Sequence, residues 1–86
     1  MNGRALVAWN LRRVRVAQGL SQETLATDAG VDRAYLGGLE RESENPTVDL
    51  LYRIAVALSV PMSELFVAPK KGERRPQPLR GGRRKE

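Results

Sequence analysis

Side chains that perform acid–base or nucleophilic chemistry are scarce in this sequence. It contains neither cysteine nor histidine, so thiolate nucleophiles, disulfides, the usual general base and the commonest metal ligand are all missing. The acidic residues are scattered over positions that we expect to face solvent. The sequence therefore predicts no enzyme, no metal site and no cofactor. Hydrogen bonding by arginine is the main chemistry that remains.

Arginines and small residues share one face of a short helix predicted near the middle of the chain. They follow the helical spacing i, i+1, i+4, i+5 and i+8, at Arg33, Ala34, Gly37, Gly38 and Arg41. Leu36 and Leu39 fall on the opposite side, which we expect to face a core. Arginine can donate two hydrogen bonds to O6 and N7 of guanine, whereas an alanine methyl can only contact the methyl group of thymine.

These positions predict contacts along a DNA major groove. Arg33 lies at the end of the helix that would enter deepest, so Arg33 and Ala34 are predicted to face the bases. Gly37 and Gly38 would let the helix lie close to the bases, with DNA shape replacing missing contacts. Arg41, at the far end, is predicted to reach a phosphate. The alternative for Arg33 is a salt bridge to Asp32, Asp28 or another nearby acid.

The segment 22–41 that positions these residues reads as two helices joined by a tight turn. Ser21 can cap the first helix, Gly30 can end it in the left-handed conformation, and Asp32 can cap the second. This order is typical of a helix-turn-helix, whose second helix enters the major groove. The alternative is an α-hairpin of the kind that any small helical bundle contains.

The rest of the chain predicts an all-α domain over residues 1–67. Further helices are expected at 3–18, 48–58 and 62–66, with Gly19 ending the first and Thr47 capping the next. Apolar residues at helical spacing supply their core faces, at Val7, Leu11, Val14, Val48, Leu51, Ile54, Ala55 and Leu58. The longest apolar runs have five residues, too few to cross a membrane. A cytoplasmic protein is expected.

Positive charge is concentrated at the end of the chain. Residues 68–86 contain eight Lys/Arg and two acids, whereas residues 1–67 contain seven Arg and eight acids. If the domain binds DNA, its arginines must therefore gather on one face. The terminal segment is rich in proline and glycine and cannot build a core, which predicts a disordered basic tail. It is either a solubilising extension or an arm that binds phosphates.

The run from about Leu11 to Phe66 resembles the Cro and phage-repressor-like helix-turn-helix family, often called the XRE family. The matching residues are Leu11-Arg12, Val14-Arg15, Gly19-Leu20-Ser21-Gln22, Leu25-Ala26, Ala29-Gly30-Val31, Leu36, Leu39-Glu40-Arg41, Asn45-Pro46-Thr47 and Leu51 through Leu58. The resemblance implies a compact five-helix bundle and a DNA-binding transcriptional regulator that acts as a homodimer, with no small-molecule ligand. Within the family, the segment 32–36, followed by Glu40-Arg41 and Asn45-Pro46, looks most like the controller proteins of restriction–modification systems.

The resemblance also assigns roles to residues. Gln22 matches a glutamine that contacts phosphate, and the other positions that the resemblance places at the DNA surface are Asp32, Arg33, Ala34, Tyr35, Gly38 and Arg41. Contacts with the DNA backbone are predicted for Gln22, Tyr35, Arg41 and Arg12. Arg15 and Glu40 occupy positions where an arginine and a glutamate pair between helices. Two departures from the family pattern are the pair Gly37-Gly38 and the residue Glu42, which stands where the family commonly has glycine. We therefore expect the recognition helix to close differently, because no glycine is present to adopt the left-handed conformation cheaply.

Helix 48–58 and the segment after it carry more apolar residues than a core stripe needs. The surplus predicts a homodimer interface formed by Leu50, Val56, Met62, Phe66 and Val67. The alternative is that these residues seal the last helix onto the core. A two-fold dimer would place two recognition helices about 34 Å apart, which predicts a near-palindromic operator. A second functional hypothesis is a protein-interaction module on the same fold, such as an antitoxin or a bridging coactivator.

Overall fold

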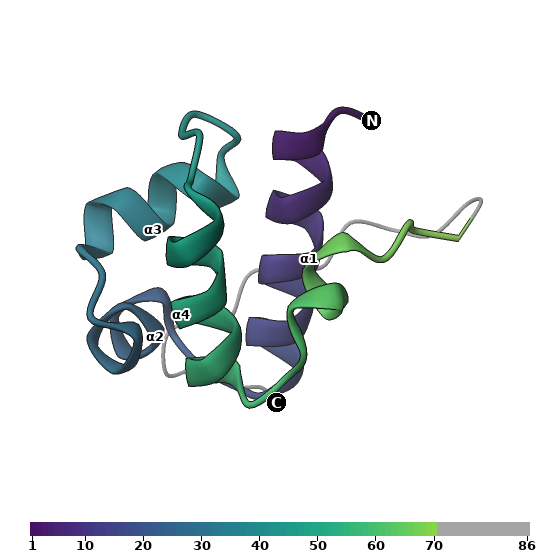
Figure 1. Cartoon of the computed structure of the whole chain (residues 1–86). Coiled ribbons are helices and arrows are strands. Elements are labelled where there is room, and N and C mark those ends of the chain that lie inside the picture. The colour runs from purple at the N-terminus through teal and green to yellow at the C-terminus, as the bar shows by residue number, and fades with distance from the viewer. Residues whose placement is uncertain (71–86) are drawn as a thin grey trace, which may run out of the picture.

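Four α-helices and one short 3₁₀ helix form the part of the chain that this computed structural model describes, residues 1–70 (Figure 1). The elements are α1 (Gly3–Ala17), α2 (Gln22–Ala29), α3 (Arg33–Glu40), α4 (Val48–Leu58) and the 3₁₀ helix η1 (Met62–Phe66). The all-α fold predicted from the sequence is confirmed, with a 3₁₀ helix as the fifth element. No helix within residues 1–70 is long and apolar enough to cross a membrane. The predicted tail lies, apart from its first residues, outside the described part of the chain.

Side-chain caps fix where the helices begin. Ser21 accepts a hydrogen bond from the backbone N–H of Thr24 at 3.0 Å, and Thr47 accepts one from Leu50 at 3.0 Å. Asp32 caps α3 through the N–H of Tyr35 at 3.1 Å. These bonds satisfy amides that have no partner inside their own helix. All three caps were predicted from the sequence and are confirmed.

The turn between α2 and α3 and the end of α1 both depend on left-handed backbone. Gly30 has a φ of 68° and Gly19 a φ of 71°, values that glycine adopts without the steric cost of a side chain. The N–H of Val31 then bonds to the carbonyl of Ala26 at 2.9 Å and closes α2. The predicted helix-turn-helix is therefore present at 22–40.

The end of α3 differs from the expectation. Glu42 adopts a φ of 65°, so the helix closes with a left-handed residue even though that residue has a side chain. The N–H of Ser43 bonds to the carbonyl of Gly38 at 2.9 Å, and the Ser43 hydroxyl donates to the same oxygen at 3.1 Å. These bonds satisfy a terminal carbonyl twice and hold Glu42 in a conformation that costs a non-glycine residue about 1–2 kcal/mol.

Aliphatic side chains from all five elements form one core. Leu11, Leu25, Leu36, Ile54 and Leu58 are fully buried within it. The core-facing residues of α1, α3 and α4 predicted from the sequence lie in this core, with one exception. Val48 is 69% exposed, because it lies with Tyr52 and Val56 on a second stripe at i, i+4 and i+8 that points away from the core.

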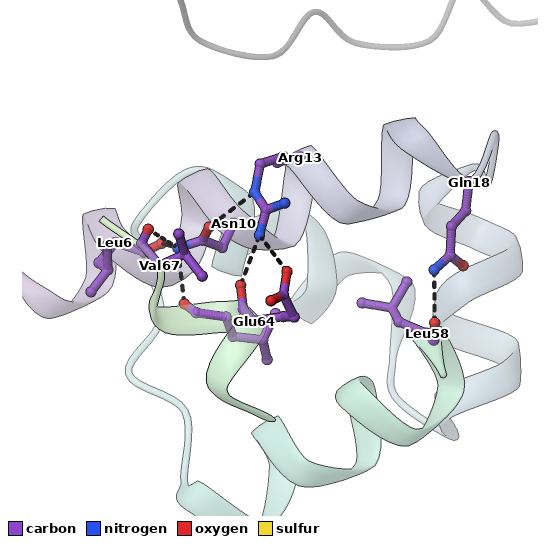
Figure 2. A network of polar contacts seen from close by, with 8 residues as sticks. Leu6, Asn10, Arg13, Gln18, Leu58, Glu64 and Val67 are labelled. Atoms are coloured by element: carbon purple, nitrogen blue, oxygen red, sulfur yellow. Dashed lines mark hydrogen bonds and ion pairs between the residues drawn. The ribbon is translucent and has the colours of Figure 1, made fainter. Parts of the chain in front are cut away.

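Asn10 joins α1 to the segment that follows α4 (Figure 2). Its side chain is fully buried, and its Nδ2 lies within 3.1 Å of the carbonyl oxygens of Leu6, Leu65 and Val67. Its Oδ1 accepts from Nε of Arg13 at 3.1 Å. Arg13 also donates to the Glu64 carbonyl at 3.0 Å. One amide thus supplies hydrogen-bond donors to backbone carbonyls at the end of η1, where the backbone hydrogen bonds of the helix provide none.

Two further side chains brace α4. Nε2 of Gln18, the residue after α1, donates to the carbonyl of Leu58 at 2.7 Å, as Figure 2 shows, and so caps the C-terminal end of α4. Arg53 donates from α4 to the carbonyl of Gly30, in the turn between α2 and α3. The turn of the helix-turn-helix is therefore stabilised by a hydrogen bond from α4 as well as by hydrophobic contacts.

We expect Asn10→Ala to lower the free energy of unfolding by more than the loss of one exposed cap. The substitution leaves several carbonyls at the end of η1 without a donor, at about 1–3 kcal/mol for a buried unsatisfied group. Asn2→Ala is the matched control, because Asn2 only caps α1 at the surface, through Ala5 at 2.9 Å. Thermal unfolding measures both. Equal or smaller destabilisation by Asn10→Ala would contradict the role given to this amide.

Candidate nucleic-acid interface

The N-terminal end of α3 presents an exposed arginine. Arg33 and Ala34 are both exposed, directly after the Asp32 cap. The ion pairs recorded within residues 1–70 join other side chains, so the predicted alternative of a salt bridge for Arg33 is not seen there. The guanidinium is therefore available to a ligand. Tyr35, the next predicted DNA contact, is half-buried and packs against the core.

The two glycines of α3 are not open to solvent, contrary to the expectation of a bare groove-facing surface. Gly38 lies under the turn that closes the helix, and a Cβ built on it would be 2.7 Å from Cγ of Glu44 and 3.1 Å from Oγ of Ser43. A side chain at this position would require the Glu44 and Ser43 side chains to move. The structure thus explains Gly38 by packing inside the protein and places no DNA-facing surface at it.

Gly37 has a different environment. A Cβ at this position would be 3.1 Å from Nη1 of Arg41 and 3.5 Å from Oε1 of Gln22. Gly37 is thus covered by the polar ends of two side chains, one at the C-cap of α3 and one at the start of α2. The guanidinium of Arg41 and the amide of Gln22 therefore occupy the space beside α3 that a side chain at position 37 would fill.

A buried carboxylate lies directly beneath this surface. The Glu40 side chain has no exposed area and that of Arg15 is 5% exposed. Arg15 binds it with two hydrogen bonds, from Nε to Oε2 at 2.6 Å and from Nη2 to Oε1 at 2.9 Å. Nε of Arg12 and Nε2 of Gln22 also donate to Oε1, at 3.2 and 3.1 Å. One carboxylate therefore links α1, α2 and α3.

These donors decide the protonation state of Glu40. Burial alone would raise the pKa of the Glu40 carboxyl, because it disfavours the charged form. Hydrogen bonds from Arg15, Gln22 and Arg12, together with the positive charge of Arg15, outweigh burial and lower the pKa below its ordinary value. Glu40 is thus ionised at neutral pH and acts only as an acceptor.

The same contacts constrain two residues predicted to touch the DNA backbone. Arg12 has only 19% of its side chain exposed and commits Nε to Glu40. Gln22 commits one amide N–H to Glu40 and turns Oε1 toward Gly37. A phosphate oxygen accepts hydrogen bonds, so only the second N–H of Gln22 can bind one. Arg41, by contrast, is exposed, and its side chain makes no recorded hydrogen bond or ion pair within residues 1–70.

Most arginines of the domain are bound within the protein, whereas a DNA-binding domain without surplus positive charge was expected to gather them on one face. Four of the seven arginines in residues 1–67 have partners inside the protein. These are Arg12 and Arg15 on Glu40, Arg13 on Asn10 and Glu64, and Arg53 on Gly30. Most of the arginine in this domain therefore serves the fold.

The residues predicted to form a dimer interface divide into two groups. Val56, Phe66 and Val67 are 58%, 45% and 44% exposed, whereas Leu50 and Met62 are partly buried against the core. Two further apolar residues of α4, Val48 and Tyr52, are exposed but were not predicted for this surface. Their spacing with Val56, four residues apart along one helix, was the signal that could have identified them.

The sequence pattern of the helix-turn-helix family matches residues 11–65. An HTH-type transcriptional regulator of Sinorhizobium fredii is 45% identical over 65 residues, which cover 76% of this chain and 84% of that protein. A hypothetical transcription factor of Neisseria meningitidis is 39% identical over 67 residues, which cover 78% of this chain and 63% of that protein.

Solved structures of transcriptional regulators are also similar to this chain. The crystal structure of the Neisseria factor is similar with a TM-score of 0.77 at 37% identity, covering 81% of this chain and 80% of that one. A restriction–modification controller protein, solved as a tetramer in complex with its natural 35-base-pair operator, is similar with a TM-score of 0.71 at 32% identity. That match covers 77% of this chain and 87% of the controller chain.

We expect Glu40→Gln to destabilise the protein far more than Glu64→Gln. Glu40→Gln leaves Arg15 buried without its anion, and breaking a buried pair costs about 3–5 kcal/mol. Glu64 is the matched control because it also pairs with an arginine, Arg13 at 3.1 Å, but its side chain is 41% exposed. Such pairs contribute under about 1 kcal/mol. Chemical denaturation measures both variants, and similar losses would show that the Glu40 pair is not exceptional.

The lowered pKa of Glu40 also predicts how this difference changes with pH. A carboxyl with a lowered pKa contributes stability above its unfolded-state value of about 4.3, and that stability is lost as the pH falls through the folded-state value. The gap in unfolding free energy between wild type and Glu40→Gln should therefore be full at pH 7 and shrink below about pH 4.3. Denaturation curves from pH 7 to pH 3 test this. A gap that stays constant over that range would contradict it.

Proposed function

This chain belongs to the helix-turn-helix family of XRE-type transcriptional regulators, and we propose that it binds an operator as a homodimer through α2 and α3. In this proposal α3 lies in the major groove, with Arg33 and Ala34 at the bases. Tyr35, Arg41 and the remaining donors of Arg12 contact the phosphates. The DNA-binding domain spans residues 1–67, and residues 68–86 form a basic extension of it.

The observation that carries the proposal is the contrast between Arg33 and the other arginines. Arg33 is exposed at the first position of α3, whereas Arg12, Arg13 and Arg15 are held by partners inside the domain. A side chain at the N-terminal end of a recognition helix can reach base edges in the major groove. A free guanidinium there has the donor geometry that guanine O6 and N7 accept.

Exposed apolar residues support the dimer. Val48, Tyr52 and Val56 follow one face of α4, and Phe66 and Val67 are exposed after it. Clustered apolar surface on a small protein is commonly an interaction site. A two-fold dimer on this surface would present two copies of α3 to one face of DNA, which favours a near-palindromic operator. The relative solved as a tetramer on its operator is consistent with assembly on DNA.

A protein-interaction module remains the alternative. It is favoured by the charge of the domain, since residues 1–67 contain eight acids and seven arginines, and strong DNA binders usually neutralise phosphates with a basic surface. Gel-shift measurements at low salt separate the two functions. A protein that shifts no DNA, including no sequence recovered from a random pool, would be a binding module for another protein.

We expect Arg33→Ala to remove the preference for one G·C pair in each half-site. A bidentate arginine–guanine contact is worth about 1–3 kcal/mol of discrimination. Arg41→Ala is the control, because loss of a phosphate contact weakens specific and random DNA by a similar factor. Affinities for the selected operator, its single-pair variants and random DNA measure both. If Arg33→Ala weakens all of these DNAs equally, Arg33 contacts phosphate instead.

We expect Val56→Asp to shift the protein toward monomer and to weaken operator binding without unfolding it. The side chain is 58% exposed in the single chain, so the charge disturbs only a surface that a partner would cover. Thr27→Asp is the control, because Thr27 is an exposed residue of α2 that does not belong to the predicted interface. Sedimentation velocity at tens of micromolar protein measures the assembly. Identical sedimentation of wild type and Val56→Asp would contradict the proposed interface.

A further inference from the structure

The orientation of the Gln22 amide follows from its partner. Oε1 of Glu40 lies 3.1 Å from one end of the amide, and an ionised carboxylate can only accept a hydrogen bond. The nitrogen, Nε2, must therefore face Glu40, and the oxygen must face the other way. The usual ambiguity between the two ends of a glutamine amide does not arise here, because the network admits one assignment.

The free end of this amide lies on the surface of α3. Oε1 of Gln22 is 3.5 Å from the place where a Cβ of Gly37 would lie. Gly37 is on the same face of the helix as Arg33, one turn further along. A larger residue at position 37 would occupy the space in front of the amide. The absence of a side chain at Gly37 is what leaves the Gln22 oxygen beside the recognition surface.

We infer that Gln22 determines sequence specificity by accepting a hydrogen bond, through Oε1, from the exocyclic amine of a base in the major groove. The inference rests on the proposed function. Adenine N6 and cytosine N4 are the amine donors that the major groove offers, and phosphate oxygens offer none. Gln22 thus supplies from α2 the acceptor that α3 lacks at Gly37. The competing role is a phosphate contact through the second N–H of Nε2.

The test begins with the full chain and a pool of random DNA, from which bound sequences are selected. Affinities are then measured for wild type and Gln22→Met on the selected operator and on the three alternatives at each base pair. Methionine keeps the length of the side chain and removes the amide. We expect the preference at one base pair per half-site to fall by about three- to tenfold, as for one hydrogen bond, with other positions and random DNA changed less than twofold.

A modified operator identifies the contact directly. At the affected pair, the adenine or cytosine is replaced by an analogue that lacks only the exocyclic amine. Wild type should lose the same three- to tenfold factor on this DNA, and Gln22→Met should lose nothing further, because the two changes remove one interaction. Whether adenine or cytosine is preferred at that pair identifies the donor.

Gly37→Ala provides a second variant in case Gln22→Met folds poorly. Its Cβ would lie 3.1 Å from Nη1 of Arg41, which must give slightly, and 3.5 Å from Oε1 of Gln22, so a methyl group would occupy the space in front of the amide oxygen. We expect a changed preference at the same base pair. The inference is overturned if Gln22→Met weakens operator and random DNA by one common factor, or if Gly37→Ala leaves that preference intact. A wild-type protein that selects no sequence would instead refute the proposed function.

Discussion

A single buried charge, the carboxylate of Glu40, organises the helix-turn-helix. It receives four hydrogen bonds, from Arg15, Arg12 and Gln22, and so joins α1, α2 and α3 at one point. Burying a charge is unfavourable unless the charged group accepts or donates enough hydrogen bonds. Here donors from α1 and from α2 both bind the carboxylate. Any rotation of α3 about its axis would withdraw Glu40 from these donors. The carboxylate therefore fixes which face of α3 is presented.

This restraint matters because α3 is a weak helix on its own. It has eight residues, two of them glycine, and each glycine costs about 1 kcal/mol relative to alanine. Isolated helices of that length are not stable in water. The order of α3 must come from the Asp32 cap, the turn at Glu42 and the contacts of Leu36, Leu39 and Glu40. The recognition helix is thus a product of its tertiary contacts.

The sequence predicted the elements well because their ends depend on local chemistry. The caps at Ser21, Asp32 and Thr47 and the left-handed Gly30 involve residues no more than five apart, and the sequence displays them directly. The surface of α3 was predicted less well. Gly38 lies against the side chains of Ser43 and Glu44, in the turn after α3. Gly37 is covered partly by the side chain of Gln22, which belongs to α2. Helical spacing carries no information about such contacts.

The distribution of arginine partners limits what the domain can contribute to DNA affinity. Four of the seven arginines of residues 1–67 are bound internally, and the segment carries one more acid than base. Non-specific affinity grows with the number of phosphates that a protein neutralises. In the proposed complex, Arg33 and Arg41 are the free cations near α3. Two cations neutralise few phosphates. The proposed DNA binding would therefore depend more on a small number of oriented groups than on strong attraction of the domain to any DNA.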